Sequence, residues 1–158
     1  MKYFLVYTLS FFLFYSALTG NINADQNKTN LKQCEDSPYK GSNLEDVKSW
    51  TNCIGTIIYT KETHDEKDIF FNVKKYEGEF QSGKANGIGK ILSIHGSEYI
   101  GEFKDNHLHG KGIMNYDGKD LIEEIIRYEG EWIESKWNGK GTLTFKLDVK
   151  YIGEFKDG

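Results

Sequence analysis

A five-residue pattern recurs four times in this chain of 158 residues and constrains its fold more than any other feature. Each copy reads Tyr-x-Gly-Glu-aromatic, and the copies lie at residues 76–80, 99–103, 128–132 and 151–155. Their tyrosines are 23, 29 and 23 residues apart. A Gly-x-Gly follows each of the first three copies, at Gly87/Gly89, Gly110/Gly112 and Gly139/Gly141. Such a period predicts a repeat architecture in which one small unit is stacked several times.

The pattern itself has the two-residue alternation of a β-strand. Tyr76, Gly78 and Phe80 would share one face of the strand, and Glu77 and Glu79 would share the other. A glycine between two aromatics leaves a gap, into which we expect rings from the neighbouring strand to lean. With 15% aromatic residues, 17 Gly and one Pro, the composition favours short strands joined by tight turns.

The connections between strands are less regular than the strands. Turns are predicted at residues 81–86, 104–109 and 133–138, where Asn106 and Ser135 replace the Gly83 of the first copy. Asn tolerates a left-handed backbone almost as well as Gly, and Ser does so less readily. A polar loop is predicted at 61–67, before a strand extension at 69–73. Residues 119–127 predict either a longer hairpin, which we prefer, or a helical turn that presses Leu121, Ile122 and Ile125 on the sheet.

These motifs resemble the repeats of the MORN family (membrane occupation and recognition nexus). The resemblance covers residues 76–158, with three full copies and a terminal half-copy. Residues 52–56 resemble a further half-copy, because they align with 138–142 and place Cys53 at a glycine position. The lead-in at 50–56, after an upstream Cys, resembles the start of exported bacterial MORN proteins. The predicted fold is therefore all-β: an elongated antiparallel sheet of stacked MORN β-hairpins with a disulfide-bridged N-terminal cap.

The first 24 residues have the features of a signal peptide. Lys2 precedes an uncharged stretch at residues 3–18, and Ala24 is a small residue suited to signal peptidase. We expect cleavage after Ala24, a flexible N-terminal tail at 25–33, and a secreted or periplasmic protein. The alternative is an uncleaved N-terminal membrane anchor, but the apolar stretch is shorter than the roughly 20 residues that a spanning helix needs.

Cys34 and Cys53 are the two cysteines of the chain. Export makes a disulfide the default state of such a pair. The bridge would close a cap at residues 34–75 that includes the half-copy. In the chain-entropy model, a loop of this length stabilises the fold by about 3 kcal/mol.

Several classes of function are disfavoured by the sequence. The formal net charge of -4 argues against nucleic acid, which needs a clustered basic face. We predict no catalytic, cofactor or metal site: nucleophile elbows and phosphate loops are absent from the sequence, and His107 and His109 lack a third ligand.

The repeated glutamates are predicted to be structural. Consecutive carboxylates would lie about 9 to 10 Å apart on the face opposite the aromatics. Nothing would separate their pKa values into acid and base roles. We expect a solvated ladder paired with Lys111 and Lys140. The ladder consists of Glu79, Glu102, Glu131 and Glu154.

The predicted function is a non-enzymatic surface for protein–protein interaction or scaffolding outside the cytoplasm. The candidate binding face is the aromatic stripe, part of which is expected to be core: Tyr76, Phe80, Tyr99, Phe103, Tyr128, Trp132, Tyr151 and Phe155. The alternative is a module that associates with membranes or lipid surfaces, although an acidic chain is not attracted to anionic headgroups. The strand at 151–155 is expected to self-associate weakly through its edge, or to bind a partner strand there.

The first prediction concerns the cysteine pair. Alkylation of the exported protein without reductant, followed by mass spectrometry, should find neither Cys34 nor Cys53 alkylated. Two alkylated thiols would show that the bridge does not form.

Overall fold

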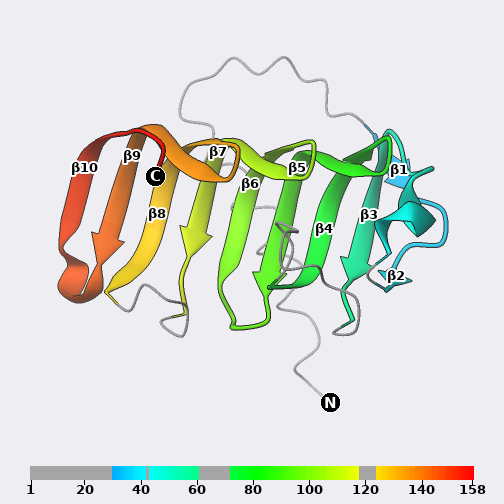
Figure 1. Cartoon of the computed structure of the whole chain (residues 1–158), viewed down its shortest axis with the longest axis horizontal. Coiled ribbons are helices and arrows are strands. Elements are labelled where there is room, and N and C mark those ends of the chain that lie inside the picture. Colours follow the sequence, from blue (N-terminus) through cyan, green and yellow to red (C-terminus); the bar gives the residue numbers. More distant parts are fainter. Residues whose placement is uncertain (1–29, 42, 61–71, 118–123) are drawn as a thin grey trace. The chain divides into compact units, whose positions relative to one another are not determined.

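The computed structural model describes residues 30–41, 43–60, 72–117 and 124–158. Ten strands form one open sheet within these residues (Figure 1). The strands are β1 Lys32–Gln33, β2 Tyr39–Lys40, β3 Cys53–Ile58, β4 Val73–Gln81, β5 Lys84–Ser93, β6 Glu98–Lys104, β7 His107–Asn115, β8 Ile125–Ile133, β9 Lys136–Phe145 and β10 Lys150–Phe155. Two short 3-10 turns, η1 Leu44–Val47 and η2 Lys146–Asp148, accompany them. The predicted signal peptide at 1–24, residues 25–29 of the predicted tail, the loop at 61–67 and residues 119–123 of the predicted 119–127 connection lie outside the described residues.

The order of the strands confirms the predicted all-β, elongated sheet. From β3 to β10 each strand pairs in antiparallel fashion with the next strand along the chain. At the other end, β1 and β2 both pair in parallel with β3. Figure 1 shows β10 at one end of the row and β1 at the other. Hairpins that pair only with their neighbours make this an open, one-dimensional stack.

A continuous row of glycines crosses the sheet at the level of the repeat motif. Every strand from β3 to β10 contributes one glycine, and each pairs directly with the next. The row consists of Gly55, Gly78, Gly89, Gly101, Gly112, Gly130, Gly141 and Gly153. Because glycine has no side chain, the row is a groove one residue wide on the aromatic face.

Tyrosine rings fill this groove. A Cβ added at Gly89 would lie 2.7 Å from Oη and 2.8 Å from Cε2 of Tyr76, and one added at Gly78 would lie 2.5 Å from the same Oη. Tyr99 and Tyr128 cover Gly101/Gly112 and Gly130/Gly141 in the same way. The expectation that rings of a neighbouring strand lean into the gap is therefore correct for return-strand glycines such as Gly89, and wrong for leading-strand glycines such as Gly78. The tyrosine two residues earlier on the same strand lies there, and it spans that strand and the return strand.

The repeated glutamates stabilise a shift in the pairing register of the two strands of a hairpin. The pairing of β6 with β7 shifts between Gly101 and Glu102, and the pairing of β8 with β9 shifts between Gly130 and Glu131. Glu102 Oε1 accepts a hydrogen bond from the backbone N–H of Lys111 at 2.9 Å, and Glu131 Oε1 accepts one from Lys140 at 3.2 Å. The prediction that the glutamates pair with Lys111 and Lys140 is therefore correct for the residues but wrong for the chemical groups. The carboxylates accept from the backbone amides of these lysines and not from their ammonium groups.

The tips of the three full hairpins are two-residue turns with both residues at positive φ. The φ values are 49° and 74° at Ser82–Gly83, 50° and 71° at Asp105–Asn106, and 48° and 63° at Glu134–Ser135. This is the type I′ conformation, which matches the twist of antiparallel strands. Ser135 thus adopts the left-handed backbone that the sequence predicted least clearly.

Side chains at the tips compensate for the two missing glycines. Asn106 Oδ1 accepts from the backbone N–H of Ala85 at 2.7 Å, and Ser135 Oγ accepts from that of Leu108 at 3.1 Å. Asn106 and Ser135 also donate their own backbone N–H to the carbonyls of the same two residues, each at 3.0 Å. Each tip is thereby tied to the preceding hairpin.

The N-terminal end is closed as the sequence predicted. Cys34 and Cys53 are bridged, and β3 pairs with β4 in the position of a return strand. The ring of Trp50 takes the position over Gly55 that tyrosines occupy elsewhere, because a Cβ there would lie 2.7 Å from its Cε3. Trp50 O also accepts from the N–H of Gly83 at 2.7 Å.

The second prediction compares two neighbouring positions. Gly101→Val should lower the free energy of unfolding by about 1 to 3 kcal/mol or more, because its Cβ would lie 2.5 Å from the Gly112 backbone. Glu102→Ala removes one hydrogen bond to an amide, worth about 0.5 to 1.5 kcal/mol. Urea unfolding midpoints measure both. A larger loss for Glu102→Ala would contradict the assignment of the two faces.

Candidate interaction surfaces

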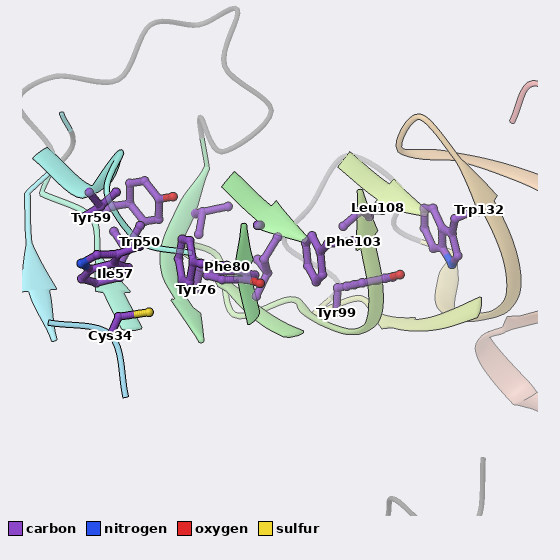
Figure 2. Close-up of a cluster of buried hydrophobic side chains, with 14 of the residues drawn as sticks. Cys34, Trp50, Ile57, Tyr59, Tyr76, Phe80, Tyr99, Phe103, Leu108 and Trp132 are labelled. Carbon is purple, nitrogen blue, oxygen red and sulfur yellow. The ribbon is translucent and has the colours of Figure 1, made fainter. Parts of the chain in front are cut away.

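The aromatic stripe forms one unbroken chain of edge-to-face contacts. Neighbouring ring centroids are 4.9 to 5.4 Å apart, and their planes are nearly perpendicular. The chain runs through Trp50, Phe80, Tyr76, Phe103, Tyr99, Trp132, Tyr128, Phe155 and Tyr151. Figure 2 shows the first part of this row of rings, with their side chains along one side of the strands. Each such pair contributes about 0.5 to 1.5 kcal/mol beyond the area it buries.

Most of the predicted binding face is the interior of the protein. Tyr76, Tyr99 and Tyr128 are 1% exposed or less, and Phe80, Phe103 and Trp132 are 3% exposed. These six side chains therefore do not present a contact surface, which corrects the expectation drawn from the sequence. The reason is that each tyrosine lies flat on glycines while the Phe or Trp of the repeat closes over it. Tyr151, 49% exposed, and the partly buried Phe155 are the exceptions.

The opposite side of the sheet, called here the open face, carries the residues that alternate with the glycines. Two rows of side chains define it, one paired across all the strands from β3 to β10 and one interrupted at the register shift of each hairpin. The middle row is Thr56, Glu77, Lys90, Ile100, Ile113, Glu129, Thr142 and Ile152. The second row is Ile54, Glu79, Ile88, Glu102, Lys111, Glu131, Lys140 and Glu154. Isoleucines therefore lie among charges of both signs.

Ion pairs on the open face fix several of its charges. Lys75 lies 2.7 Å from Glu77, Lys90 lies 2.8 Å from Glu98, and Arg127 lies 2.9 Å from Glu129. These groups are roughly a third to a half exposed, so each pair contributes at most about 1 kcal/mol to stability. Burial raises the pKa of the half-buried Glu79, and a hydrogen bond from the backbone N–H of Ile88 opposes this shift.

The isoleucines of the open face are the surface feature that the sequence analysis missed. Ile54, Ile88 and Ile152 are 39%, 36% and 77% exposed. The signal was available, because these residues alternate with the glycines of the repeat and must face away from the tyrosines. At the β10 end, the open face also has a shallow depression of about 430 Å³ between Glu129, Lys140, Thr142, Ile152 and Glu154.

The titratable residues give no sign of a metal centre in the part of the chain that the structure describes. His107 and His109 lie on β7, and no group of three or more His, Cys, Asp or Glu among the described residues is placed to hold a metal ion. The described helical segments are also too short and polar to cross a membrane.

The comparison with known families supports the resemblance seen in the motifs. The MORN repeat profile matches residues 76–93, 99–119 and 128–146, which are the three complete hairpins with their return strands. These matches support MORN repeats at all three positions. Residues 52–56, the predicted half-copy, lie outside them.

Comparison with characterised proteins finds partial relatives in mammals. Alsin of Rattus norvegicus is 31% identical over 91 residues, which cover 58% of this chain and 6% of Alsin. Human Alsin is 30% identical over 91 residues. The ALS2 C-terminal-like protein of Bos taurus is 26% identical over 128 residues, 81% of this chain and 13% of that protein. The chain thus spans a small part of each relative, and the similarities point to a non-catalytic repeat module.

The third prediction concerns the buried tyrosines. The structure raises the pKa of Tyr76, Tyr99 and Tyr128. Burial is the main cause, and the negative charge of the nearby glutamate is the second. Because the folded-state pKa exceeds the unfolded value of about 10, their contribution to stability is fully present below that pH and is lost as the pH rises from there through the raised folded-state pKa. Phenolate absorbance from these three should therefore appear only as the circular dichroism of the sheet is lost. Ionisation of all tyrosines in an intact sheet would contradict this.

Proposed function

We propose that this chain is a non-enzymatic MORN-repeat protein that offers its open face to a protein partner outside the cytoplasm. MORN repeats are generally interaction or membrane-association modules. The observation that carries the proposal is the set of exposed isoleucines on the open face. The aromatic residues of the repeats are buried in the core on the other face of the same sheet.

The chemistry of the open face fits a protein interface. Ile100 and Ile113 pair across β6 and β7, and Ile88 on β5 lies on the same face. Charged residues surround them, with Lys90 on β5 and Lys111 on β7. Protein interfaces combine an apolar centre with a polar rim in this way. A sheet held by its own side chains also loses little conformational freedom when it binds.

The extracytoplasmic setting rests on the N-terminal sequence and on the cysteines. Residues 1–24 have the signal-peptide pattern, and a bridged pair such as Cys34–Cys53 persists in oxidising compartments. The proposal includes that this chain is a MORN protein of the exported bacterial type. The relatives named above are mammalian and give no support to this part of the proposal.

A membrane surface is the competing target. Anionic lipids attract clustered Lys and Arg, but the lysines and the arginine of the open face lie beside glutamates, as in Lys75–Glu77 and Arg127–Glu129. Attraction to an anionic bilayer is therefore weak, and the charge pattern favours a protein partner.

The fourth prediction tests the open face with two matched variants. Ile88→Arg places a charge on the open face, and Ile94→Arg places the same charge in the β5–β6 connection, where Ile94 is 48% exposed. Pull-downs from the protein's own extracytoplasmic fraction should recover a partner with the wild type and Ile94→Arg, and lose it with Ile88→Arg.

The protein isolated from that fraction should begin at Asp25.

Two outcomes would contradict the proposal. Equal recovery by both variants, with circular dichroism showing that both are folded, would exclude the open face. Flotation of the wild-type chain with anionic liposomes, without any protein partner, would favour the membrane alternative instead.

A further inference from the structure

One repeat position places an aliphatic and two basic side chains in line on the open face. It is the middle residue of the Gly-x-Gly, which is Ile88 on β5, Lys111 on β7 and Lys140 on β9. All three residues are exposed, because a residue next to a glycine of the row points to the face opposite the tyrosines. The three full hairpins therefore present these groups at equivalent places.

The ammonium groups of these two lysines have no carboxylate partner among the described residues. The neighbouring glutamates bind the backbone instead: Glu102 accepts from the amide of Lys111 and lies against Gly110, where an added Cβ would be 2.5 Å from its Cδ. Glu131 binds the amide of Lys140 in the same way. The ion pairs found in the described part of the chain all join other residues. Both ammonium groups therefore keep their N–H donors for a ligand.

The interval between these three positions is set by the sheet. β5, β7 and β9 are return strands, and one leading strand, β6 or β8, lies between each two of them. Neighbouring strands are about 4.7 to 4.9 Å apart, so Ile88, Lys111 and Lys140 follow one another at intervals of about 9 to 10 Å. A ligand segment that contacts all three must repeat its own side chains at this interval.

Among regular backbones, a polyproline II helix fits this interval best. It has three residues per turn and rises about 3.1 Å per residue, so residues on one side are about 9.3 Å apart. Residues on one side of a β-strand are about 6.6 or 13 Å apart. Residues seven apart in an α-helix are about 10.5 Å apart, which gives a mismatch of about 2 Å over two intervals.

We propose that the open face binds an acidic segment of a partner protein in the polyproline II conformation. This inference rests on the proposed function and names the chemistry of the partner. The segment carries an aliphatic residue and then a carboxylate at each of the next two positions on the same side. These groups contact Ile88, Lys111 and Lys140 in that order. A preformed helix of this kind loses little conformational freedom on binding.

An anionic bilayer matches this face less well. Glu102 pairs with Ile88, and Glu131 pairs with Lys111, so both glutamates lie in the same row as the three contact positions. A continuous negative surface would meet as many carboxylates as ammonium groups along this row. A segment with a carboxylate at every third residue contacts the lysines and places no charge against the two glutamates.

The test uses two synthetic peptides that differ in the position of their charges. In the first, one leucine and two glutamates occupy every third position of an otherwise all-proline chain. The control has the same composition, but its two glutamates are moved by one position in opposite directions and point to other sides. Fluorescent forms are titrated with the 158-residue protein. We expect saturable binding of the first peptide and at least about tenfold weaker binding of the control, a difference of about 1.4 kcal/mol.

Two variants of the protein locate the contact. The double charge reversal Lys111→Glu/Lys140→Glu should weaken binding of the first peptide at least about tenfold. It should instead bind a peptide in which lysines replace the two glutamates. Lys32→Glu makes the same change on the exposed strand β1, away from the open-face row, and should bind the first peptide as the wild type does.

Three results would overturn the proposal. Equal binding of the two peptides would exclude a role for the interval. Equal binding by the wild type and the double variant, both folded by circular dichroism, would exclude the lysines. Failure of the first peptide to bind the folded wild-type protein would exclude the segment, and flotation on phosphatidylserine liposomes that the double variant loses would assign the lysines to lipid.

The proposed function is judged separately. If the double variant still recovers the protein partner that Ile88→Arg loses, the open face remains the interaction surface and the acidic chemistry of the partner is wrong.

Discussion

The structure depends on one contact, a tyrosine ring that lies across two glycines on paired strands. The contact requires both halves of the hairpin, because one glycine comes from the leading strand and the other from the return strand. It also sets the position of the next aromatic residue, since Phe103 packs edge-to-face on both Tyr76 and Tyr99. A side chain larger than hydrogen in the row would displace the ring and break the chain of contacts.

The remaining features of the repeat hold this arrangement in register. The glutamate carboxylate fastens the shifted part of each return strand through a backbone amide. The tips connect successive hairpins through Gly83, Asn106 and Ser135. Because the aromatic side is thereby filled, the open face is the surface of the sheet that remains exposed.

The sequence predicted the architecture well because its period was unambiguous. Strand positions follow from alternation and glycine spacing, and the Cys34–Cys53 bridge was predicted from a cysteine pair in a chain with a signal-peptide pattern. The binding face could not be predicted in the same way. Alternation places Tyr99 and Phe103 on one face, but it cannot tell whether rings fill their own glycine groove or project into solvent. The role of Glu102 was hidden for a similar reason, since its partner is a backbone amide that exists only once the register shift has formed.

The most direct test of this account is the NMR chemical shift of the glycine α-protons. If the Tyr99 ring lies over Gly101 and Gly112, their α-protons should be displaced upfield by the ring current, and Tyr99→Leu should return them to ordinary values. Gly96, which lies between β5 and β6 and whose nearest side chain is that of Asp117, provides the internal reference. Ordinary shifts for Gly101 and Gly112 in the folded wild-type protein would contradict the central claim that tyrosines lie on paired glycines.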